Sequence, residues 1–319
     1  MSDKPVIANL DELLPHYARY RAMLTGGSAA VDNRLKGPGA GIVSGFMERS
    51  ASYDAILFDA FGVLNRGGTA IAGAAETIAA VTRRGQPFYV VSNNASNSPA
   101  RIAAKLQGMG FDIPVGRIVA SGQAVPPWLA GSPFAGRPYY LVGTGDSRDH
   151  FVPDPESLMV NHPGYRGETA DAECVIVCSN RDFYSTAQQA EVDALLEHKK
   201  VPLILANPDL ISPIEGGFYA VAGYTAAQLA QRYGVEMVGV GKPFSPIFQL
   251  ALERLGRPDP ARVLMVGDTL DTDISGARAL GMDAALTLSG LYQGQEKRID
   301  AICSQRGIVP DFIVPSIAD

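Results

Sequence analysis

The sequence predicts an α/β protein with a three-layer core around a parallel sheet and an inserted α/β cap. Short apolar runs alternate with helical stretches from Tyr53 onward, which is typical of parallel strands covered by helices. The same texture recurs over about 137–236, inside the sequence of the core. A length of 319 residues exceeds what one hydrophobic core commonly organises, so a second folded part is expected.

The core is predicted to comprise residues 51–136 and 237–319, after an amino-terminal extension over residues 1–50. Apolar runs bounded by turn residues predict its strands at Ala55–Asp59, Pro87–Ser92, Arg117–Ala120, Val263–Gly267, Ala284–Leu288 and Phe312–Val314. Helices are expected after the first two strands, at Ala70–Arg84 and Pro99–Gly108. The second helix has proline at its start and glycine at its end, as helices favour.

The cap, predicted over residues 137–236, repeats this alternation. Its strands are expected at Tyr139–Val142, Cys174–Cys178 and Leu203–Ala206, and its helices at Ala187–Lys199 and Ala226–Tyr233. Because core strands resume at Val263, the cap interrupts the core sequence instead of following it.

The composition argues against several classes of partner. The formal charge is −6 and the basic residues are scattered, so no stripe is present to neutralise a nucleic-acid backbone. No window approaches the apolar length that spans a membrane, and the amino terminus does not resemble a leader, so a cytoplasmic protein is expected. The three cysteines are expected to be reduced core residues.

Polar side chains gather where predicted strands end. Asp59 ends the first strand and Ser92 the second, Lys242 lies in a later turn, and Asp268 and Asp273 follow the strand Val263–Gly267. The carboxyl ends of parallel strands meet at one edge of a sheet, so these groups are expected to form one site.

This set of residue types suits phosphoryl transfer. Asp59 can act as a nucleophile if a cation screens it from an anionic substrate, and Asp59 with Asp268 suits one Mg²⁺, which prefers oxygen ligands. Asp273 can orient a metal-bound water or the lysine. Ser92 and the backbone amides after it can hold phosphoryl oxygens, and Lys242 can neutralise their charge.

The four segments around Asp59, Ser92-Asn93-Asn94, Gly241-Lys242-Pro243 and Gly267–Ile274 resemble the four motifs of the haloacid dehalogenase superfamily. An insertion between the serine and lysine motifs resembles its class IIA branch, with a C2-type cap. The resemblance implies that Asp59 forms an aspartyl-phosphate. It also implies that Asp59, Asp268 and the Phe61 carbonyl bind Mg²⁺, with Asp273 nearby. A small phosphorylated molecule would be bound by Ser92, Asn93, Asn94 and Lys242. Relatives of this class also imply a homodimer formed through the cap. Asn207-Pro208-Asp209 resembles the segment that leads from cap to core in this class, although a plain turn is an equal interpretation.

The sequence departs from the resembled family at Phe61. Phosphatases of the superfamily carry there a second aspartate that serves as general acid and base, and phenylalanine transfers no proton. General acid–base catalysis contributes about 10²–10⁴-fold, so hydrolysis is expected to be weak or limited to good leaving groups.

Two alternatives follow from Phe61. An aromatic residue at this position resembles true haloacid dehalogenases, but those enzymes place their cap between the first two motifs. Here only 33 residues separate Asp59 from Ser92, and Asp268 and Asp273 would crowd negative charge around a carboxylate substrate. The other alternative is a binding or regulatory module that keeps the phosphate site without turnover.

Overall fold

The structure is a computed structural model, and it describes residues 6–7, 20, 23, 41–151, 158–181, 183, 186–214 and 217–319. Most of the extension predicted over residues 1–50 lies outside the described residues, although helix α2 (Phe46–Ser50) falls within them. The chain divides into two compact units. Among the described residues, we call 41–92, 99–119 and 243–319 the core unit, and 6–7, 20, 23, 93–98 and the described part of 120–242 the cap unit.

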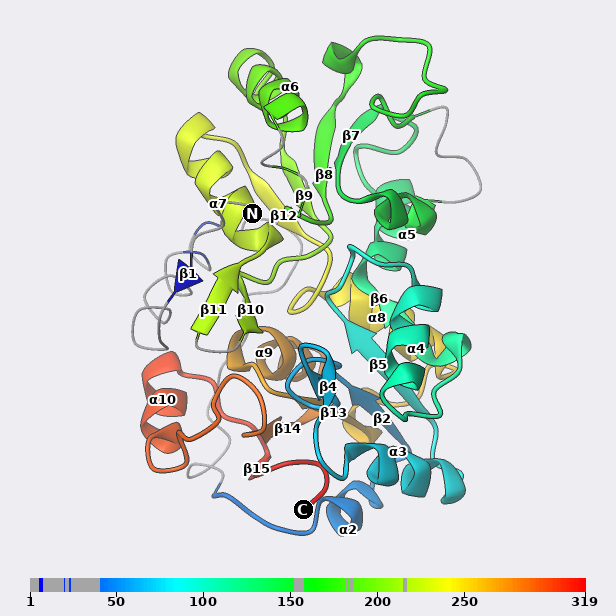
Figure 1. The fold of residues 1–319 in the computed structure, drawn as a ribbon, viewed down its shortest axis with the longest axis vertical. Helices are drawn as coiled ribbons and strands as arrows, with labels where there is room; N and C mark the ends of the chain where they lie inside the picture. Colours follow the sequence, from blue (N-terminus) through cyan, green and yellow to red (C-terminus); the bar gives the residue numbers. More distant parts are fainter. Residues whose placement is uncertain are drawn as a thin grey trace. The chain divides into compact units, whose positions relative to one another are not determined.

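The core unit is built on a six-stranded sheet in the order β15-β14-β13-β2-β5-β6 (Figure 1). The strands are β2 (Ala55–Phe58), β5 (Phe88–Ser92), β6 (Ile118–Ala120), β13 (Val263–Gly267), β14 (Asp283–Thr287) and β15 (Phe312–Val314). β2 is parallel to β5 and β13, and β14 is parallel to β13 and β15. Every side chain of β2 and β13 is buried, as expected of strands covered on both faces. The predicted α/β fold and its core strands are confirmed.

Helices connect these strands. They are α3 (Ala74–Arg83), α4 (Pro99–Gly108), α8 (Ser245–Arg254), α9 (Ser275–Ala279) and α10 (Ile299–Arg306). α3 buries Ala74, Thr77, Ile78 and Val81, the spacing that places one helical face against a sheet. α8 packs against β5, and α9 packs against β14.

The strand order reverses at β2, and this reversal positions the site. After β2 the chain adds β5 and β6 on one side of it, and β13, β14 and β15 on the other side. In open parallel sheets ligands bind at such a switch point, outside the carboxyl ends of the two neighbouring strands. Here the neighbours are β2 and β13, so the residues that follow them, Asp59 and Asp268, share one edge of the sheet.

The cap unit contains a four-stranded parallel sheet in the order β12-β9-β8-β7 (Figure 1). Its strands are β7 (Tyr139–Val142), β8 (Cys174–Val177), β9 (Leu203–Leu205) and β12 (Met237–Gly239). Residues 120–136 and 237–242, which the prediction placed in the core, group with this unit. β12 extends the sheet beyond the predicted boundary at 236 because it pairs with β9.

The helices of the cap unit are α5 (Val125–Ala130), α6 (Thr186–His198) and α7 (Ala222–Tyr233), and α7 packs against β8, β9 and β12. α7 begins four residues before its predicted start at Ala226. A separate antiparallel sheet joins β1 (Val6–Ile7), β11 (Gly217–Ala220) and β10 (Ile211–Ile214).

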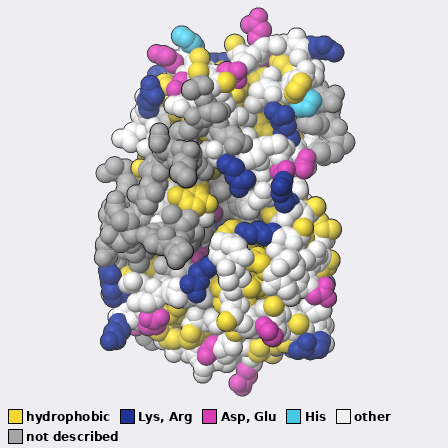
Figure 2. All heavy atoms as spheres, in the orientation of Figure 1, with side chains coloured by type: hydrophobic (Ala, Val, Ile, Leu, Met, Phe, Trp, Pro, Cys, Tyr) yellow, Lys and Arg dark blue, Asp and Glu magenta, His cyan; other side chains and the backbone are white. Residues whose placement is uncertain are grey.

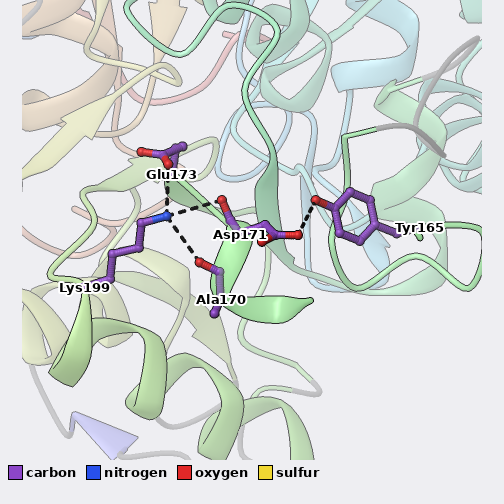
Figure 3. Close-up of polar contacts among 5 residues, drawn as sticks. All are labelled: Tyr165, Ala170, Asp171, Glu173 and Lys199. Carbon is purple, nitrogen blue, oxygen red and sulfur yellow. Dashed lines mark hydrogen bonds and ion pairs between the residues drawn. The ribbon is translucent and has the colours of Figure 1, made fainter. Parts of the chain in front are cut away.

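The carboxyl end of α6 is joined to the segment before β8 (Figure 3). Lys199 Nζ donates to the carbonyl oxygens of Ala170 at 3.2 Å and Asp171 at 3.3 Å, and pairs with Glu173 Oε1 at 3.0 Å. The Tyr165 hydroxyl donates to Asp171 Oδ2 at 2.9 Å. The Lys199 and Glu173 side chains are 36% and 43% exposed, so water screens their ion pair and it contributes about 0–1 kcal/mol. This cluster is a surface contact between two elements of the cap unit.

The described surface carries charge of both signs. On the face shown in Figure 2, Lys and Arg side chains are interspersed with Asp and Glu side chains. Among the described residues, no helix is both long enough and apolar enough to cross a membrane.

The three cysteines are buried and free, as predicted. Burial raises the pKa of the Cys174 and Cys303 thiols to about 12, so both stay protonated near neutral pH. The thiolate is the reactive form of cysteine, so these side chains act as small apolar core residues.

His150 is a buried histidine of the cap unit. Its side chain is 6% exposed, and a Cβ at Gly122 would lie 2.2 Å from the ring, so the imidazole packs directly on the Gly122 backbone. Burial lowers the pKa of His150 below its ordinary value of 6.5, although the backbone groups of Ala95 and Asn97 and the carboxylates of Asp149 and Asp146 oppose this shift.

This depressed pKa predicts a loss of stability in acid. The unfolded chain takes up a proton at His150 below about pH 6.5, whereas the folded chain resists it. The free energy of unfolding therefore has its full His150 contribution above pH 6.5 and falls below it, by up to about 1.4 kcal/mol per pH unit until the folded pKa is reached. Urea unfolding at pH 7.5 and pH 5.5 measures this, and His150→Gln should show a smaller decrease than the wild type. An equal decrease in both proteins would contradict the prediction.

Candidate active site

Asp59 lies at the switch point of the core sheet. Its backbone N–H donates to the Val266 carbonyl at 2.8 Å, which extends the β2–β13 pairing by one residue, and its side chain is only 9% exposed. The chain then turns sharply at Gly62, where φ is +79°. A Cβ at Gly62 would lie 2.0 Å from Asp268 Oδ2, so only glycine fits between the two aspartate-bearing loops.

A short antiparallel hairpin follows this turn. It consists of β3 (Asn65–Arg66) and β4 (Thr69–Ala70), and Gly62 N–H donates to the Asn65 carbonyl at 2.8 Å. The hairpin lies within the short stretch of sequence that separates Asp59 from Ser92. It fixes the backbone that follows Asp59.

Three buried carboxylates converge at this edge. Oxygen atoms of Asp59, Asp268 and Asp273 all lie within 4.8 Å of one another. Asp273 Oδ2 accepts the backbone N–H groups of Asp268 at 3.2 Å and Thr269 at 3.1 Å. Asp268 Oδ1 accepts the Thr269 hydroxyl at 2.9 Å, and its Oδ2 accepts the Leu291 N–H at 2.8 Å. The sequence prediction that these three aspartates meet is confirmed.

The donor set of this cluster fits a hard divalent cation. Carboxylates so close together repel one another unless a positive charge lies among them. Carboxylate oxygens are among the ligands that Mg²⁺ prefers, and Asp59, Asp268 and Asp273 supply them here. The residues present therefore fit the metal that the sequence predicts.

A buried ion pair holds the loop that carries Asp268 and Asp273. Arg306 on α10 donates to Asp271, which lies between Asp268 and Asp273, and the two side chains are 8% and 3% exposed. Removing one partner of such a buried pair leaves an uncompensated charge, which is strongly destabilising. The pair thus joins the loop that carries Asp268 and Asp273 to the last helix of the core unit.

Phe61 stands two residues after Asp59 and is half-buried. The ammonium of Lys105, on α4, lies 4.8 Å from the centre of its ring, within the range of a cation–π contact. The phenyl ring has no group that gives or takes a proton. The structure therefore places a cation beside the aromatic residue, and the acid that the resemblance would supply at position 61 is lacking.

Ser92 ends β5, the strand beside β2, and its side chain is 2% exposed. Phe58 pairs with Val90 in this register, so Asp59 and Ser92 both emerge at the carboxyl edge of neighbouring strands. This is the arrangement that the sequence predicts for a nucleophile and a phosphate-binding hydroxyl.

Asn93 and Lys242 are brought together within the cap unit. The Lys242 N–H donates to Asn93 Oδ1 at 2.7 Å, and Asn93 Nδ2 donates to the Lys242 carbonyl at 2.9 Å and to Asp209 Oδ1 at 2.8 Å. Asn94, half-buried, accepts the Ser96 N–H at 3.2 Å through its own Oδ1. Asn93 is one of the predicted phosphate-binding residues, and its side-chain amide forms hydrogen bonds with protein groups.

Sequence reasoning missed Lys105 and the pair between Arg306 and Asp271, and left Asp209 undecided between the segment that leads from cap to core and a plain turn. No local signal marks these residues, because each acts through a partner far along the chain. Lys105 resembles any exposed helical lysine until the fold places Phe61 beside it.

Comparison with known proteins agrees with this geometry. Residues 56–151 match the family described as haloacid dehalogenase-like hydrolase, and residues 239–319 match a second family, described as HAD-hydrolase-like. Human glycerol-3-phosphate phosphatase is 31% identical over 297 residues, covering 84% of this chain and 90% of that protein. Mouse chronophin is 29% identical over 270 residues, covering 83% of this chain and 90% of that protein.

Solved structures extend the likeness to three dimensions. A possible sugar phosphatase of the HAD superfamily from Cytophaga hutchinsonii superposes with a TM-score of 0.77 at 28% identity. The match covers 88% of this chain and 99% of that one, so it includes both the core and the inserted part. The chain therefore belongs to the haloacid dehalogenase-like hydrolases, as the sequence motifs predict.

Proposed function

We propose that this protein is a Mg²⁺-dependent phosphatase that acts on a small phosphorylated metabolite through an aspartyl-phosphate on Asp59. The observation that supports it most is the cluster of Asp59, Asp268 and Asp273 at the switch point of the sheet. The glycerol-3-phosphate phosphatase and the possible sugar phosphatase among the similar proteins support the same class of reaction.

In the proposed mechanism, a carboxylate oxygen of Asp59 attacks phosphorus and the bond from phosphorus to the leaving oxygen breaks. The leaving group departs with that electron pair and takes a proton from solvent, since Phe61 has none to give. Water then attacks phosphorus of the aspartyl-phosphate and loses a proton to solvent, while the bond from phosphorus to the Asp59 oxygen breaks, so that inorganic phosphate leaves and the Asp59 carboxylate is restored. Ser92 and Lys242 hold the phosphoryl oxygens during both steps.

Asp59, Asp268 and the Phe61 carbonyl would hold Mg²⁺, with Asp273 orienting the loop. When bound, the ion neutralises charge between the carboxylate nucleophile and the anionic phosphoryl group. Asp273 contributes here by fixing the backbone of Asp268 and Thr269 through its own hydrogen bonds.

Phe61 sets the proposed substrate range. A leaving group of low basicity, such as an aryl or acyl phosphate, departs without protonation. An alkyl oxygen needs a general acid, whose absence raises the barrier by roughly 3–5 kcal/mol. We therefore propose slow turnover of alkyl phosphates and faster turnover of aryl or acyl phosphates.

The test of this function measures three substrates with Mg²⁺ and with EDTA: p-nitrophenyl phosphate, glycerol 3-phosphate and 2-chloropropionate. Phosphate release that needs Mg²⁺ and is faster for the aryl ester supports the proposal. Chloride release without metal would show a dehalogenase instead. Binding of inorganic phosphate without turnover of any substrate would show a binding module.

Metal binding has its own expected signature. Mg²⁺ at a hundred times its Kd should stabilise the folded protein by about 2.7 kcal/mol, which raises Tm by several degrees. Asp268→Asn should remove this rise, because it takes one carboxylate from the cluster. Asp300→Asn, a change at an exposed aspartate at the start of α10, is the matched control and should retain the rise. Equal rises in both variants would place the metal elsewhere.

A further inference from the structure

The side chain of Asn93 holds the backbone of Lys242 from both directions. Its Oδ1 accepts the Lys242 N–H at 2.7 Å, and its Nδ2 donates to the Lys242 carbonyl at 2.9 Å. Asn93 is 3% exposed and Lys242 is 2% exposed, so water does not compete for these bonds. The amide thus pairs with both polar groups of one residue, as a neighbouring strand would.

Lys242 needs such a partner because of where it lies. Strand β12 ends at Gly239, and the last ladder-like bonds beyond it run from the Val240 and Gly241 N–H groups to the Leu205 carbonyl at 2.9 Å and 3.4 Å. Helix α8 begins at Ser245. The Lys242 backbone therefore falls between two regular elements, and the Asn93 amide satisfies it there.

Asp209 determines the orientation of the Asn93 side-chain amide. Its Oδ1 accepts the second N–H of Asn93 Nδ2 at 2.8 Å, so the nitrogen faces Asp209 and the Lys242 carbonyl while the oxygen faces the Lys242 N–H. Asp209 is itself held by its turn, since its N–H donates to Asn207 Oδ1 at 3.0 Å and its carbonyl accepts the Gly223 N–H at 2.9 Å.

Close packing leaves this arrangement little freedom. A Cβ at Gly241 would lie 2.7 Å from Asn93 Oδ1, 2.5 Å from the Ala206 carbonyl oxygen and 2.6 Å from Pro208 Cδ. Glycine at 241 thus permits the backbone before Lys242 to approach both Asn93 and the Asn207–Asp209 turn.

We propose that Asn93 and Asp209 are positioning residues for Lys242: Asn93 clamps the lysine backbone and Asp209 orients the clamp, so that the ammonium is presented to the phosphoryl group. This inference rests on the proposed function, in which Lys242 binds phosphoryl oxygens. It gives the Asn93 side chain a role that acts through the lysine and involves no contact with substrate.

A double-mutant cycle with Lys242 distinguishes a role of Asn93 that acts through the lysine from direct contact of Asn93 with substrate. Asn93→Asp keeps an acceptor for the Lys242 N–H but loses both donations and places a carboxylate against Asp209. We expect kcat/KM for p-nitrophenyl phosphate to fall about 10²-fold, since misplacement of a binding group by about 1 Å has effects of this size. The affinity for inorganic phosphate should fall with it. In a Lys242→Ala background, which leaves the clamped backbone intact, the same change should have less than about a threefold further effect.

Multiplicative effects in that cycle would overturn the proposal, because they would mean that Asn93 contacts substrate independently of Lys242. Asp209 gives a second arm: Asn93→Asp with Asp209→Asn restores a donor facing position 93 and should recover about tenfold of the loss. Failure to recover any activity in a folded double variant, judged by its Tm, would contradict the orienting role of Asp209.

Two controls keep the outcome decisive. If Asn93→Asp does not fold, Asn93→Ser removes the clamp without adding charge, and the cycle is measured with that variant. If the wild type neither hydrolyses the aryl ester nor binds inorganic phosphate, the proposed function itself fails. If the wild type is active, the double-mutant cycle tests only whether Asn93 acts through Lys242, and its failure leaves the proposed function standing.

Discussion

Replacing Phe61 by aspartate is expected to raise kcat/KM for an alkyl phosphate such as glycerol 3-phosphate by about 10²–10⁴-fold, the usual contribution of a general acid. Position 61 follows Asp59 by two residues, and the turn at Gly62 and the β3–β4 hairpin fix its backbone. The new carboxyl group is therefore carried by a loop whose conformation is already set. The same change should raise the rate with p-nitrophenyl phosphate much less, because that leaving group needs little protonation. Steady-state kinetics with both esters measures the difference.

Phe61→Asn is the matched control for this gain. Asparagine has nearly the shape and polarity of aspartate, but it transfers no proton. If both variants gain equally on the alkyl ester, relief of a steric block by the ring explains the effect and general acid catalysis does not. If neither variant gains, proton transfer at position 61 does not limit turnover, and the proposed substrate range must be abandoned.

Lys105 adds a further consideration at this position. Its ammonium lies 4.8 Å from the Phe61 ring centre, and an opposite charge nearby favours the ionised form of a carboxyl group. A carboxyl group at position 61 would therefore titrate lower beside Lys105 than without it. Because Lys105 is exposed and screened by solvent, the gain in Phe61→Asp should survive its presence.

The core strands could be predicted because strands buried on both faces need a continuous apolar sequence. The aspartate cluster could be predicted because the carboxyl ends of neighbouring parallel strands lie at one edge of the sheet. Runs such as Ala55–Phe58 and Val263–Gly267 are continuously apolar, which strands covered on both faces require. A carboxylate directly after each run must then emerge at the same sheet edge. Asp59 and Asp268 meet although 209 residues separate them, because β2 and β13 are neighbours.

The direction of the Asn93 side chain could not be predicted in this way. An asparagine after a strand can bind a ligand, cap a helix or pair with backbone, and the choice depends on which groups the fold brings within reach. Here the partners are Lys242 and Asp209, 149 and 116 residues away in the chain. The same holds for Arg306, whose carboxylate partner Asp271 is 35 residues away. Nothing in the local sequence of these residues specifies such contacts.

Asp59→Asn is expected to lower kcat/KM with p-nitrophenyl phosphate by roughly 10⁴-fold or more, since removal of a covalent nucleophile has effects of at least this size. An amide oxygen is a poor nucleophile, and the aspartyl-phosphate no longer forms. In the wild type, Phe61 supplies no base to activate the second water, so the intermediate should accumulate. We therefore expect a burst of p-nitrophenol near one equivalent per site, and one added phosphoryl group in the intact mass after an acid quench.

Asp54→Asn provides the matched control for the nucleophile. Asp54 stands at the opposite end of the same strand, 58% exposed, and its ion pair with Arg262 at 2.8 Å is a surface contact of small energetic value. This variant should keep both the burst and the steady-state rate. If Asp59→Asn retained either one, or if the wild type showed turnover without any trapped phosphoryl group under conditions of slow hydrolysis, direct attack by water would replace the covalent mechanism. The buried cluster would then act through its cation alone, and Asp59 would be a ligand and not a nucleophile.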